Sequence, residues 1–214
     1  KQNNEIIEKY NKNIKKLKDL KKNYKKLKTF KLDLKDVFKV QKFLKKNIYF
    51  KNIDIFISLS GYLSFSNFEN FKIKEFLNHL NVNYLSNIII LRLVIKNMIK
   101  KKWGRVLLTS SIGTKFGGAE NTFMYSITKF LNEFFPKKFK QVTKLNVLIN
   151  TLKIGVTNTK LLKKDRIKNL KKRVNLIPLK RMASTNEVAD KILFLATEKN
   201  TLISGQIINI SGGE

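Results

Sequence analysis

Residues 105–111 read RVLLTSS, and residues 125–129, which begin fourteen positions after the serine pair, read YSITK. The first segment is an almost continuous apolar run that ends in hydroxyl side chains, a pattern typical of a strand buried in a parallel sheet. A glycine-containing loop follows, and residues 122–143 have the spacing of a helix. Strand, loop and helix in this order predict a unit of an α/β fold.

Tyr125 and Lys129 are four positions apart, so both side chains project from one face of the predicted helix. A positive charge beside a phenol stabilises the phenolate and lowers the pKa of the phenol. Such a pair is suited to moving a proton on or off an alcohol oxygen. Tyr24 and Lys28 have the same spacing, but they lie in a lysine-dense segment without a serine or glycine loop nearby. We interpret that second pair as a solvated face, so the motif gains its meaning from its context.

Segments on either side continue the alternation of strand and helix. We predict further strands at 27–34, 53–61, 145–155 and 204–213, and helices at 1–28, 36–47, 73–101 and 184–198. The last helix is expected to begin with a capping box from Ser184 to Glu187. The pattern predicts an α/β doubly wound parallel sheet in a single domain that spans residues 1–214.

Polar or glycine residues lie at or just after the ends of four predicted strands. They are Asp33, Gly61, Ser111 and Gly155. In a doubly wound sheet, ligands bind beyond the carboxyl ends of the strands. We therefore expect these residues to converge on one crevice.

The composition excludes several classes of site. The chain has no cysteine and one histidine, His79, so we expect no disulfide, no thiolate chemistry and no metal site. His79 is expected to be a partly buried structural residue. No uncharged apolar run reaches the roughly 18 residues of a membrane helix, and the start of the chain has no secretory signal pattern. We expect a cytoplasmic protein without a membrane partner.

The net charge of +30 raises the possibility of a nucleic-acid partner. The basic residues are mostly Lys and are spread along the chain, whereas readout of nucleic acids favours Arg. Abundant Lys, Asn, Ile and Phe indicate a coding bias, so we consider a nucleic-acid role unlikely. Attraction to acidic partners, such as an acidic carrier protein, follows from the charge in either case.

Several motifs occur in the order of one known family. ISLSG resembles its N-N-A-G element, with Ser58, Leu59 and Ser60 in place of N-N-A. HLNVNYLSN, GRVLLTSS, YSITK and NTLKIGVTNT resemble further family segments, with Ile154 in place of a proline, and residues 177–213 follow its C-terminal stretch. Over residues 1–214 the chain therefore resembles the short-chain dehydrogenase/reductase family, which has a Rossmann-type sheet. The resemblance is closest to the 3-oxoacyl-(acyl-carrier-protein) reductase branch.

The resemblance implies an NAD(P)-dependent oxidoreductase that interconverts a carbonyl and an alcohol by hydride transfer, with Tyr125 as general acid/base. The catalytic residues that it implies are Asn83, Ser111, Tyr125 and Lys129. The residues that it implies for binding NAD or NADP are Asp33, Ser60, Gly61, Tyr125, Lys129, Gly155 and Thr159. Tyr125 would need a lowered pKa, to which Lys129 and the oxidised nicotinamide would contribute.

Some of these assignments have alternatives. Ser110 is the alternative to Ser111, and Asn81 and Asn87 offer other registers for Asn83. Asp33 is also explained as a turn residue. Thr159 is also explained as a helix N-cap, which is compatible with contact to the cofactor.

The T-G-x-x-x-G-x-G turn of the family does not occur in the sequence, which begins with Lys1. That turn binds the pyrophosphate at a helix N-terminus. We therefore expect a sequence that lacks the first strand-helix-strand unit, on the order of 30 residues. The 27–34 strand would then have no partner, and residues 1–214 alone would be poorly stable, bind no dinucleotide and be inactive.

The expected substrate is a small or carrier-bound carbonyl or alcohol compound, and a sugar fits as well as an acyl chain. The resemblance implies a homodimer or homotetramer assembled through the 73–101 and 122–143 helices. The alternative function is a non-catalytic basic binding protein on the same fold, with a nucleic acid or an acidic partner. Replacement of Tyr125 by Phe separates the two, because only an enzyme would lose turnover.

Overall fold

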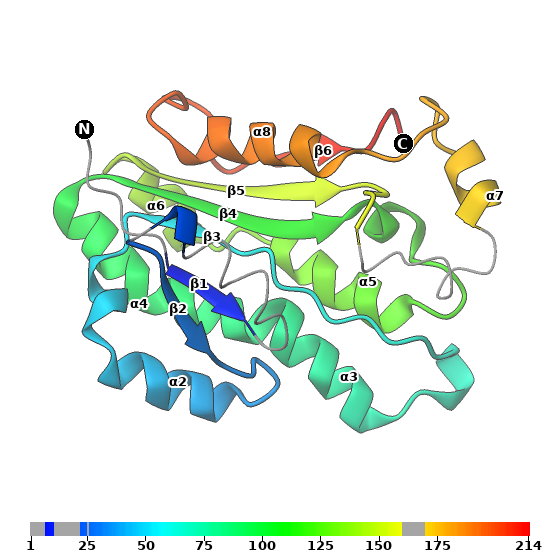
Figure 1. Cartoon of the computed structure of the whole chain (residues 1–214), viewed down its shortest axis with the longest axis horizontal. Helices are drawn as coiled ribbons and strands as arrows, with labels where there is room; N and C mark the ends of the chain where they lie inside the picture. The colour runs from blue at the N-terminus through cyan, green and yellow to red at the C-terminus, as the bar shows by residue number, and fades with distance from the viewer. Residues whose placement is uncertain (1–6, 11–21, 25, 160–169) are drawn as a thin grey trace.

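Parallel strands form two sheets in the computed structural model, which describes residues 7–10, 22–24, 26–159 and 170–214 (Figure 1). One sheet pairs β1 (Ile7–Tyr10) with β2 (Lys28–Lys31). The other has the order β3-β4-β5-β6. Its strands are β3 (Ile55–Ile57), β4 (Gly104–Ser111), β5 (Val147–Ile154) and β6 (Ile207–Ile210).

Helices cover both faces of the larger sheet, with α8 on one face and α4 on the other (Figure 1). The α-helices are α2 (Val37–Lys46), α3 (Ile73–Leu80), α4 (Ser86–Lys101), α5 (Phe123–Phe130), α6 (Lys137–Thr143), α7 (Leu170–Asn175) and α8 (Thr185–Ala196). Shorter turns are η1 (Ile48–Asn52), η2 (Phe68–Asn70), the π-helical η3 (Asn81–Leu85), η4 (Ile112–Phe116) and η5 (Leu131–Glu133). The predicted parallel α/β architecture is confirmed.

Strand β4 lies inside the sheet and contributes to the core on both faces. Val106 and Leu108 belong to the cluster that includes Val94 and Met98 of α4. Leu107 belongs to the cluster with Ile192 of α8. Because successive side chains alternate between the faces, β4 is buried from Gly104 to Ser110, and its carboxyl end at Ser111 is held at a fixed position.

The helical run Ile73–Lys101 is long and apolar enough to cross a membrane, by length and composition alone. This differs from the expectation that its charged residues would prevent such a match. The inward side chains of this run explain its apolar character, because Leu91, Val94 and Met98 are buried against β4 and β5.

The predicted helix over residues 1–28 is wrong at β1, and residues 1–6 and 11–21 lie outside the described residues. Ile7 to Tyr10 pair in parallel with Lys28 to Lys31. The expectation that the 27–34 strand has no partner is therefore also wrong. Four residues are too few for periodicity to distinguish strand from helix, so pairing with β2 decides the conformation.

The predicted helix over residues 122–143 is divided in two. Helix α5 ends at Phe130, η5 follows, and α6 begins after Pro136, which is its N-cap residue. Proline disfavours helical geometry at the residue before it and has no N–H to donate. This break ends the helix of Tyr125 and Lys129 one residue after the lysine.

Strand β3 is less buried than its apolar sequence predicts, with Ile55 40% and Ile57 36% exposed. Among the described residues, the strand lies at the edge of its sheet and pairs with β4 alone. In contrast, the predicted capping box is confirmed, because Ser184 and Glu187 bond each other's backbone N–H groups at the start of α8.

Candidate active site

Lys129 projects from α5 to the carboxyl ends of β3 and β4 and is 3% exposed. Its ammonium donates to the carbonyl oxygens of Ser60 and Thr109, each at 3.1 Å, and to Thr109 Oγ1 at 3.0 Å. An ammonium has three N–H donors, so each has an acceptor. The lysine therefore joins one helix to the ends of two strands.

Burial changes the pKa values of both residues of the YSITK pair. It lowers the pKa of Lys129 to about 8 and raises the pKa of Tyr125 to about 12, with a hydrogen bond to Ser111 acting in the opposite direction. The expected lowering of the Tyr125 pKa by Lys129 is not seen. The ammonium points toward the carbonyl groups of Ser60 and Thr109, which explains why its charge does not control the phenol.

The two serines at the end of β4 have different partners. Ser111 lies beside the phenol of Tyr125, whose pKa it lowers, and its Oγ accepts from Gly113 N at 3.2 Å. Ser110 is buried and donates to Glu133 Oε1 at 2.6 Å. The structure thus brings Ser111, and not Ser110, to the tyrosine.

Asn83 lies in the π-helical turn η3 between α3 and α4 and is completely buried. Its Oδ1 accepts from Tyr62 N at 2.7 Å, and its Nδ2 donates to Tyr62 O at 3.1 Å and to Thr128 Oγ1 at 3.0 Å. Thr128 precedes Lys129 on α5. Asn83 therefore links the segment after β3 to the helix that carries Tyr125.

The other asparagines of this region occupy different positions. Asn81 donates to the carbonyl of Lys35 at 2.7 Å, beyond β2. Asn87 is buried, donates to the carbonyl of Asn83 at 2.9 Å, and accepts from Ser60 Oγ at 3.1 Å. Asn83 is thus the residue that bonds α5, and Asn87 supports it from the next turn.

The residues expected to bind the cofactor differ in how close they lie to Lys129 and in how much space surrounds them. The Ser60 carbonyl contacts Lys129, and Gly61 follows with open space, since a Cβ there would meet nothing within 4 Å. Gly155 is packed tightly, because a Cβ would lie 2.7 Å from Ser211 Cα. Thr159 is exposed.

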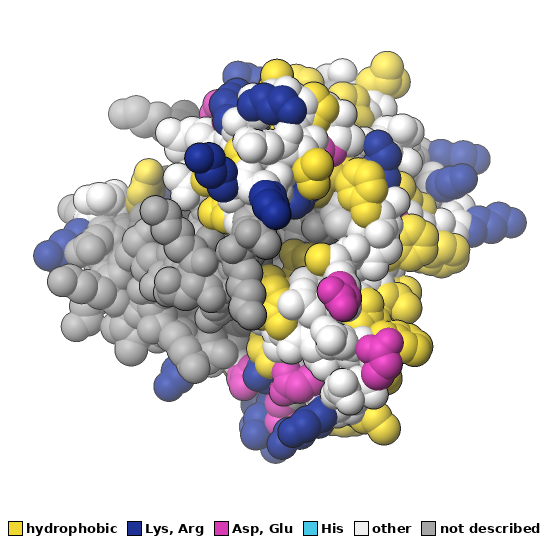
Figure 2. Space-filling view, turned by 90° about the vertical axis from the view of Figure 1, so that its right-hand side faces the viewer, with side chains coloured by type: hydrophobic (Ala, Val, Ile, Leu, Met, Phe, Trp, Pro, Cys, Tyr) yellow, Lys and Arg dark blue, Asp and Glu magenta, His cyan; other side chains and the backbone are white. Residues whose placement is uncertain are grey.

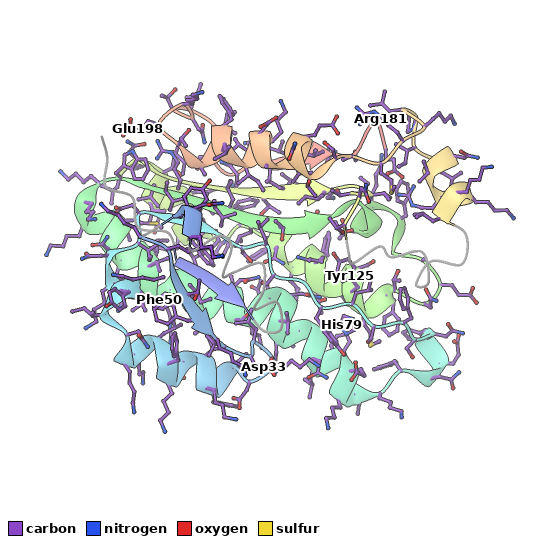
Figure 3. The ribbon with its side chains drawn as sticks, in the orientation of Figure 1. Asp33, Phe50, His79, Tyr125, Arg181 and Glu198 are labelled. Atoms are coloured by element: carbon purple, nitrogen blue, oxygen red, sulfur yellow. The ribbon has the colours of Figure 1, made fainter. Side chains whose placement is uncertain are left out.

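Asp33 lies after β2, on a different part of the fold from Tyr125 (Figure 3). Its Oδ1 accepts from Lys35 N at 3.0 Å, which is the geometry of an Asx turn. The turn interpretation therefore accounts for Asp33 in this structure. Contact between Asp33 and a nucleotide stays a prediction.

Thr109 and Glu133 are site residues that the sequence analysis did not identify. Thr109 supplies two acceptors to Lys129. Glu133 pairs with Lys153 at 2.8 Å and also accepts from Thr114 Oγ1 at 2.7 Å. The spacing of four between Lys129 and Glu133 suggests a pair on one helix, but α5 ends between them.

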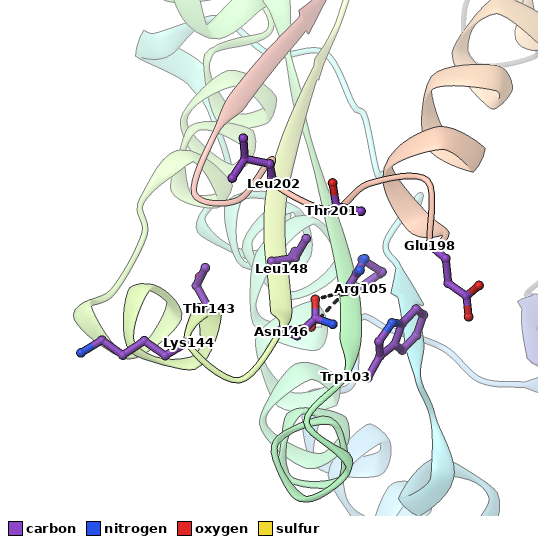
Figure 4. A pocket seen from close by; sticks show the side chains of 9 residues that line it. All are labelled: Trp103, Arg105, Thr143, Lys144, Asn146, Leu148, Glu198, Thr201 and Leu202. Atoms are coloured by element: carbon purple, nitrogen blue, oxygen red, sulfur yellow. Dashed lines mark hydrogen bonds between the residues drawn. The ribbon is translucent and has the colours of Figure 1, made fainter.

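A cavity of about 620 Å³ lies at the opposite edge of the sheet, near the amino ends of β4 and β5 (Figure 4). Arg105 is buried there and donates to the carbonyls of Asn146 and Asn200, both at 2.9 Å. Its guanidinium also lies 4.6 Å from the Trp103 ring centroid. These contacts give Arg105 a structural role far from Tyr125 in the fold.

Comparison with known proteins identifies relatives of the chain. A family model described as enoyl-(acyl carrier protein) reductase matches residues 4–214. The 3-oxoacyl-(acyl-carrier-protein) reductase FabG of Buchnera aphidicola subsp. Schizaphis graminum is 32% identical over 186 residues, 85% of this chain and 75% of that protein. L-rhamnose 1-dehydrogenase (NADP(+)) of Thermoplasma acidophilum is 28% identical over 187 residues, 85% of this chain and 73% of that protein.

Solved structures show the same fold. The 3-oxoacyl (acyl-carrier-protein) reductase of Agrobacterium tumefaciens C58, solved with NADP bound, superposes with a TM-score of 0.84 at 19% identity. The match covers 97% of this chain and 83% of that one. Since the family model extends over nearly all of the sequence, the chain belongs to the short-chain dehydrogenase/reductase family of oxidoreductases.

Proposed function

We propose that this protein is an NAD(P)-dependent reductase that converts the carbonyl of a carrier-bound 3-oxoacyl group to an alcohol, with Tyr125 as the proton donor. The observation that carries the proposal is that the Ser111 hydroxyl, at the end of β4, lies close enough to the Tyr125 phenol to lower its pKa. It places two hydroxyl groups from different elements beside each other at the carboxyl end of β4. Such a pair can bind one carbonyl oxygen.

The cofactor is NAD or NADP, and the residues at the ends of β3 and β4 fit its nicotinamide end. The Tyr125 hydroxyl suits a ribose hydroxyl group, and such a group would replace one of the three acceptors of the Lys129 ammonium to bond it. Gly61 leaves open space beside Ser60. The Ser58 hydroxyl at the same strand end is buried without a hydrogen-bond partner. When bound, the nicotinamide supplies the hydride.

Tyr125 is protonated at neutral pH, because burial raises its pKa to about 12. It therefore holds the proton that the carbonyl oxygen would receive as that oxygen gains negative charge, and nearby positive charge would have to lower its pKa for efficient transfer. Ser111 stabilises the same oxygen by a second hydrogen bond.

Lys129 keeps its charge at neutral pH, because its lowered pKa is still about 8. Its acceptors on Ser60 and Thr109 hold the ammonium between the two strand ends. Asn83 fixes the adjacent turn of α5 through Thr128. Lys129 and Asn83 thus position the tyrosine relative to both strands.

The substrate class follows from the similarity to 3-oxoacyl-(acyl-carrier-protein) reductases and from the charge of the chain. A net charge of +30 attracts an acidic carrier protein at long range. The similarity to a rhamnose dehydrogenase makes a sugar the second substrate to test.

The direct test uses the protein as its gene encodes it. In one assay a 3-oxoacyl thioester is mixed with the reduced nicotinamide cofactor. In a second assay L-rhamnose is mixed with the oxidised cofactor. The absorbance of the reduced nicotinamide is followed in both. We expect consumption of reduced cofactor with the thioester. Absence of both turnover and cofactor binding contradicts the proposal.

The second candidate is a binding protein without catalysis, favoured by the high positive charge. On the face shown in Figure 2, Lys and Arg side chains alternate with hydrophobic and acidic ones. A nucleic-acid groove would need a continuous basic stripe. Binding of a polyanion that is equal in the wild type and Tyr125→Phe, without any turnover, would support this candidate.

A further inference from the structure

His79 is completely buried, and both of its ring nitrogens have backbone partners. Nδ1 lies 2.8 Å from the carbonyl oxygen of Glu75, which can only accept a hydrogen bond. Nε2 lies 3.1 Å from the N–H of Ser64, which can only donate one. The ring that satisfies both contacts is neutral, with its proton on Nδ1.

Ser64 belongs to residues 62–66, a segment that follows β3 and connects the candidate catalytic elements. At one end, the backbone N–H and carbonyl of Tyr62 bond the side chain of Asn83 at 2.7 and 3.1 Å. At the other end, Ser66 N donates to Asn121 O at 3.0 Å, just before α5. Between them, the segment is fastened to α3 through Ser64 and His79.

The charged and titratable groups around the ring come from three elements. Glu75, on the same helix as His79, accepts from Tyr62 OH at 2.6 Å and from Ser64 Oγ at 3.0 Å. The Tyr62 ring packs edge-on against the imidazole, with centroids 4.9 Å apart. Lys35, after β2, lies 4.3 Å from the Tyr62 ring centroid. Burial and Lys35 lower the pKa of His79, and Glu75 acts in the opposite direction.

We propose that His79 is a positioning residue for Asn83, and that protonation of its ring removes the backbone hydrogen bond from Ser64 to α3, which leaves the segment held there by the hydroxyl bonds of Tyr62 and Ser64 to Glu75. A proton on Nε2 would face the Ser64 N–H, donor against donor, and that hydrogen bond would be lost. Movement of the segment would then disturb the two bonds between Tyr62 and Asn83. The consequence for catalysis rests on the proposed function, since Asn83 reaches α5 through Thr128.

Nuclear magnetic resonance tests the proposal without an activity assay. His79 is the single histidine of the printed sequence, so in an untagged protein one imidazole signal belongs to it. Long-range ¹H–¹⁵N correlation is expected to show the neutral Nδ1–H form at neutral pH. The side-chain amide signals of Asn83 are expected to shift with the same acid midpoint as the ring. An imidazolium or an Nε2–H ring at neutral pH, or an Asn83 amide that does not follow the ring, overturns it.

Variants connect the ring to catalysis. His79→Gln offers an oxygen that can accept from Ser64 N–H at every pH, whereas His79→Leu offers none. We expect the wild type to lose kcat at acid pH and both variants to lack this loss, with a roughly tenfold to hundredfold lower kcat in His79→Leu at all pH values. His79→Gln is expected to recover most of that kcat. Circular dichroism checks that each variant is folded.

Lys74→Gln is the matched control, because Lys74 is exposed on the same helix. It removes one charge from α3 and is expected to leave the acid limb in place. An acid limb that persists in folded His79→Gln contradicts the proposal. If the wild type has no turnover, the proposed function fails, while the resonance experiment still decides the role of His79.

Discussion

The Lys129 ammonium donates a hydrogen bond of 3.1 Å to the carbonyl oxygen of Ser60, a residue 69 positions earlier in the chain. The bond ties the helix of Tyr125 to the end of β3, where Gly61 leaves open space. It also directs the ammonium toward backbone carbonyls. The lysine therefore acts by holding the strand ends and the helix together, as well as by its charge.

Substitutions of the two serines at the end of β4 should have different effects, one on kcat and the other on stability. Ser111→Ala removes the hydroxyl that lies beside the Tyr125 phenol, and we expect kcat to fall roughly 10²–10³-fold, as for loss of a donor to a developing oxyanion. Ser110→Ala is the matched variant, since Ser110 bonds Glu133. It should lower the free energy of unfolding by about 1 kcal/mol with a much smaller effect on kcat. Steady-state kinetics and urea unfolding measure both, and the reverse ranking of kcat would contradict the assignment.

The Lys129 pKa predicts the alkaline side of the pH profile. The ammonium loses its proton above pH of about 8, so kcat/KM should fall as the pH rises through that value. Lys129→Arg stays charged across this range. We expect it to have a lower kcat, because the guanidinium does not fit the three acceptors, and no decline near pH of about 8. A decline at the same pH in the arginine variant would assign the limb to another group.

The Lys129 ammonium also makes the free energy of unfolding depend on pH. Its pKa is lowered on folding, from 10.5 to about 8, so between these values the unfolded chain holds more protons than the folded one. The contribution of Lys129 to the free energy of unfolding therefore rises with pH through this window. Urea unfolding of the wild type and of Lys129→Met, compared at several pH values, isolates this contribution. If the free energy of unfolding of the wild type, relative to Lys129→Met, decreased as the pH rose through this window, the predicted direction would be wrong.

Gly104 and Gly61 provide a matched pair of stability predictions. A Cβ on Gly104 would lie 2.6 Å from Met98 Cβ, where α4 packs on the start of β4. Gly104→Ala should lower the free energy of unfolding by about 1–3 kcal/mol. A Cβ on Gly61 would meet nothing within 4 Å, so Gly61→Ala should lie within about 0.5 kcal/mol of the wild type. Denaturant unfolding gives both values, and equal losses would contradict the packing argument.

The sequence predicts the parts of this structure that depend on local pattern. Buried strands such as RVLLTSS, the capping box at Ser184 and the helical run ending at Lys101 follow from apolar spacing and end signals. The convergence of Ser60, Ser111 and Lys129 follows from the rule that parallel strands end at one edge. These features need no knowledge of which strand pairs with which.

Other features depend on contacts between distant residues and could not be predicted. Strand β1 exists through its pairing with β2, and the exposure of Ile57 follows from its place at the edge of a sheet. The high pKa of Tyr125 follows from burial, while Lys129 is directed toward Ser60. Pro136 is a helix-breaking signal within residues 122–143, whose apolar spacing alone favours one continuous helix.

The most direct test of the central claim is the rate of NADPH consumption with a 3-oxoacyl thioester for Tyr125→Phe and Tyr24→Phe. Tyr24 has the same spacing to a lysine but is 55% exposed, so it is the matched control. The account predicts a roughly 10²–10⁴-fold loss of kcat for Tyr125→Phe, with retained NADPH binding and normal turnover of Tyr24→Phe. Turnover of Tyr125→Phe within a few fold of the wild type would contradict the assignment of Tyr125 as the proton donor.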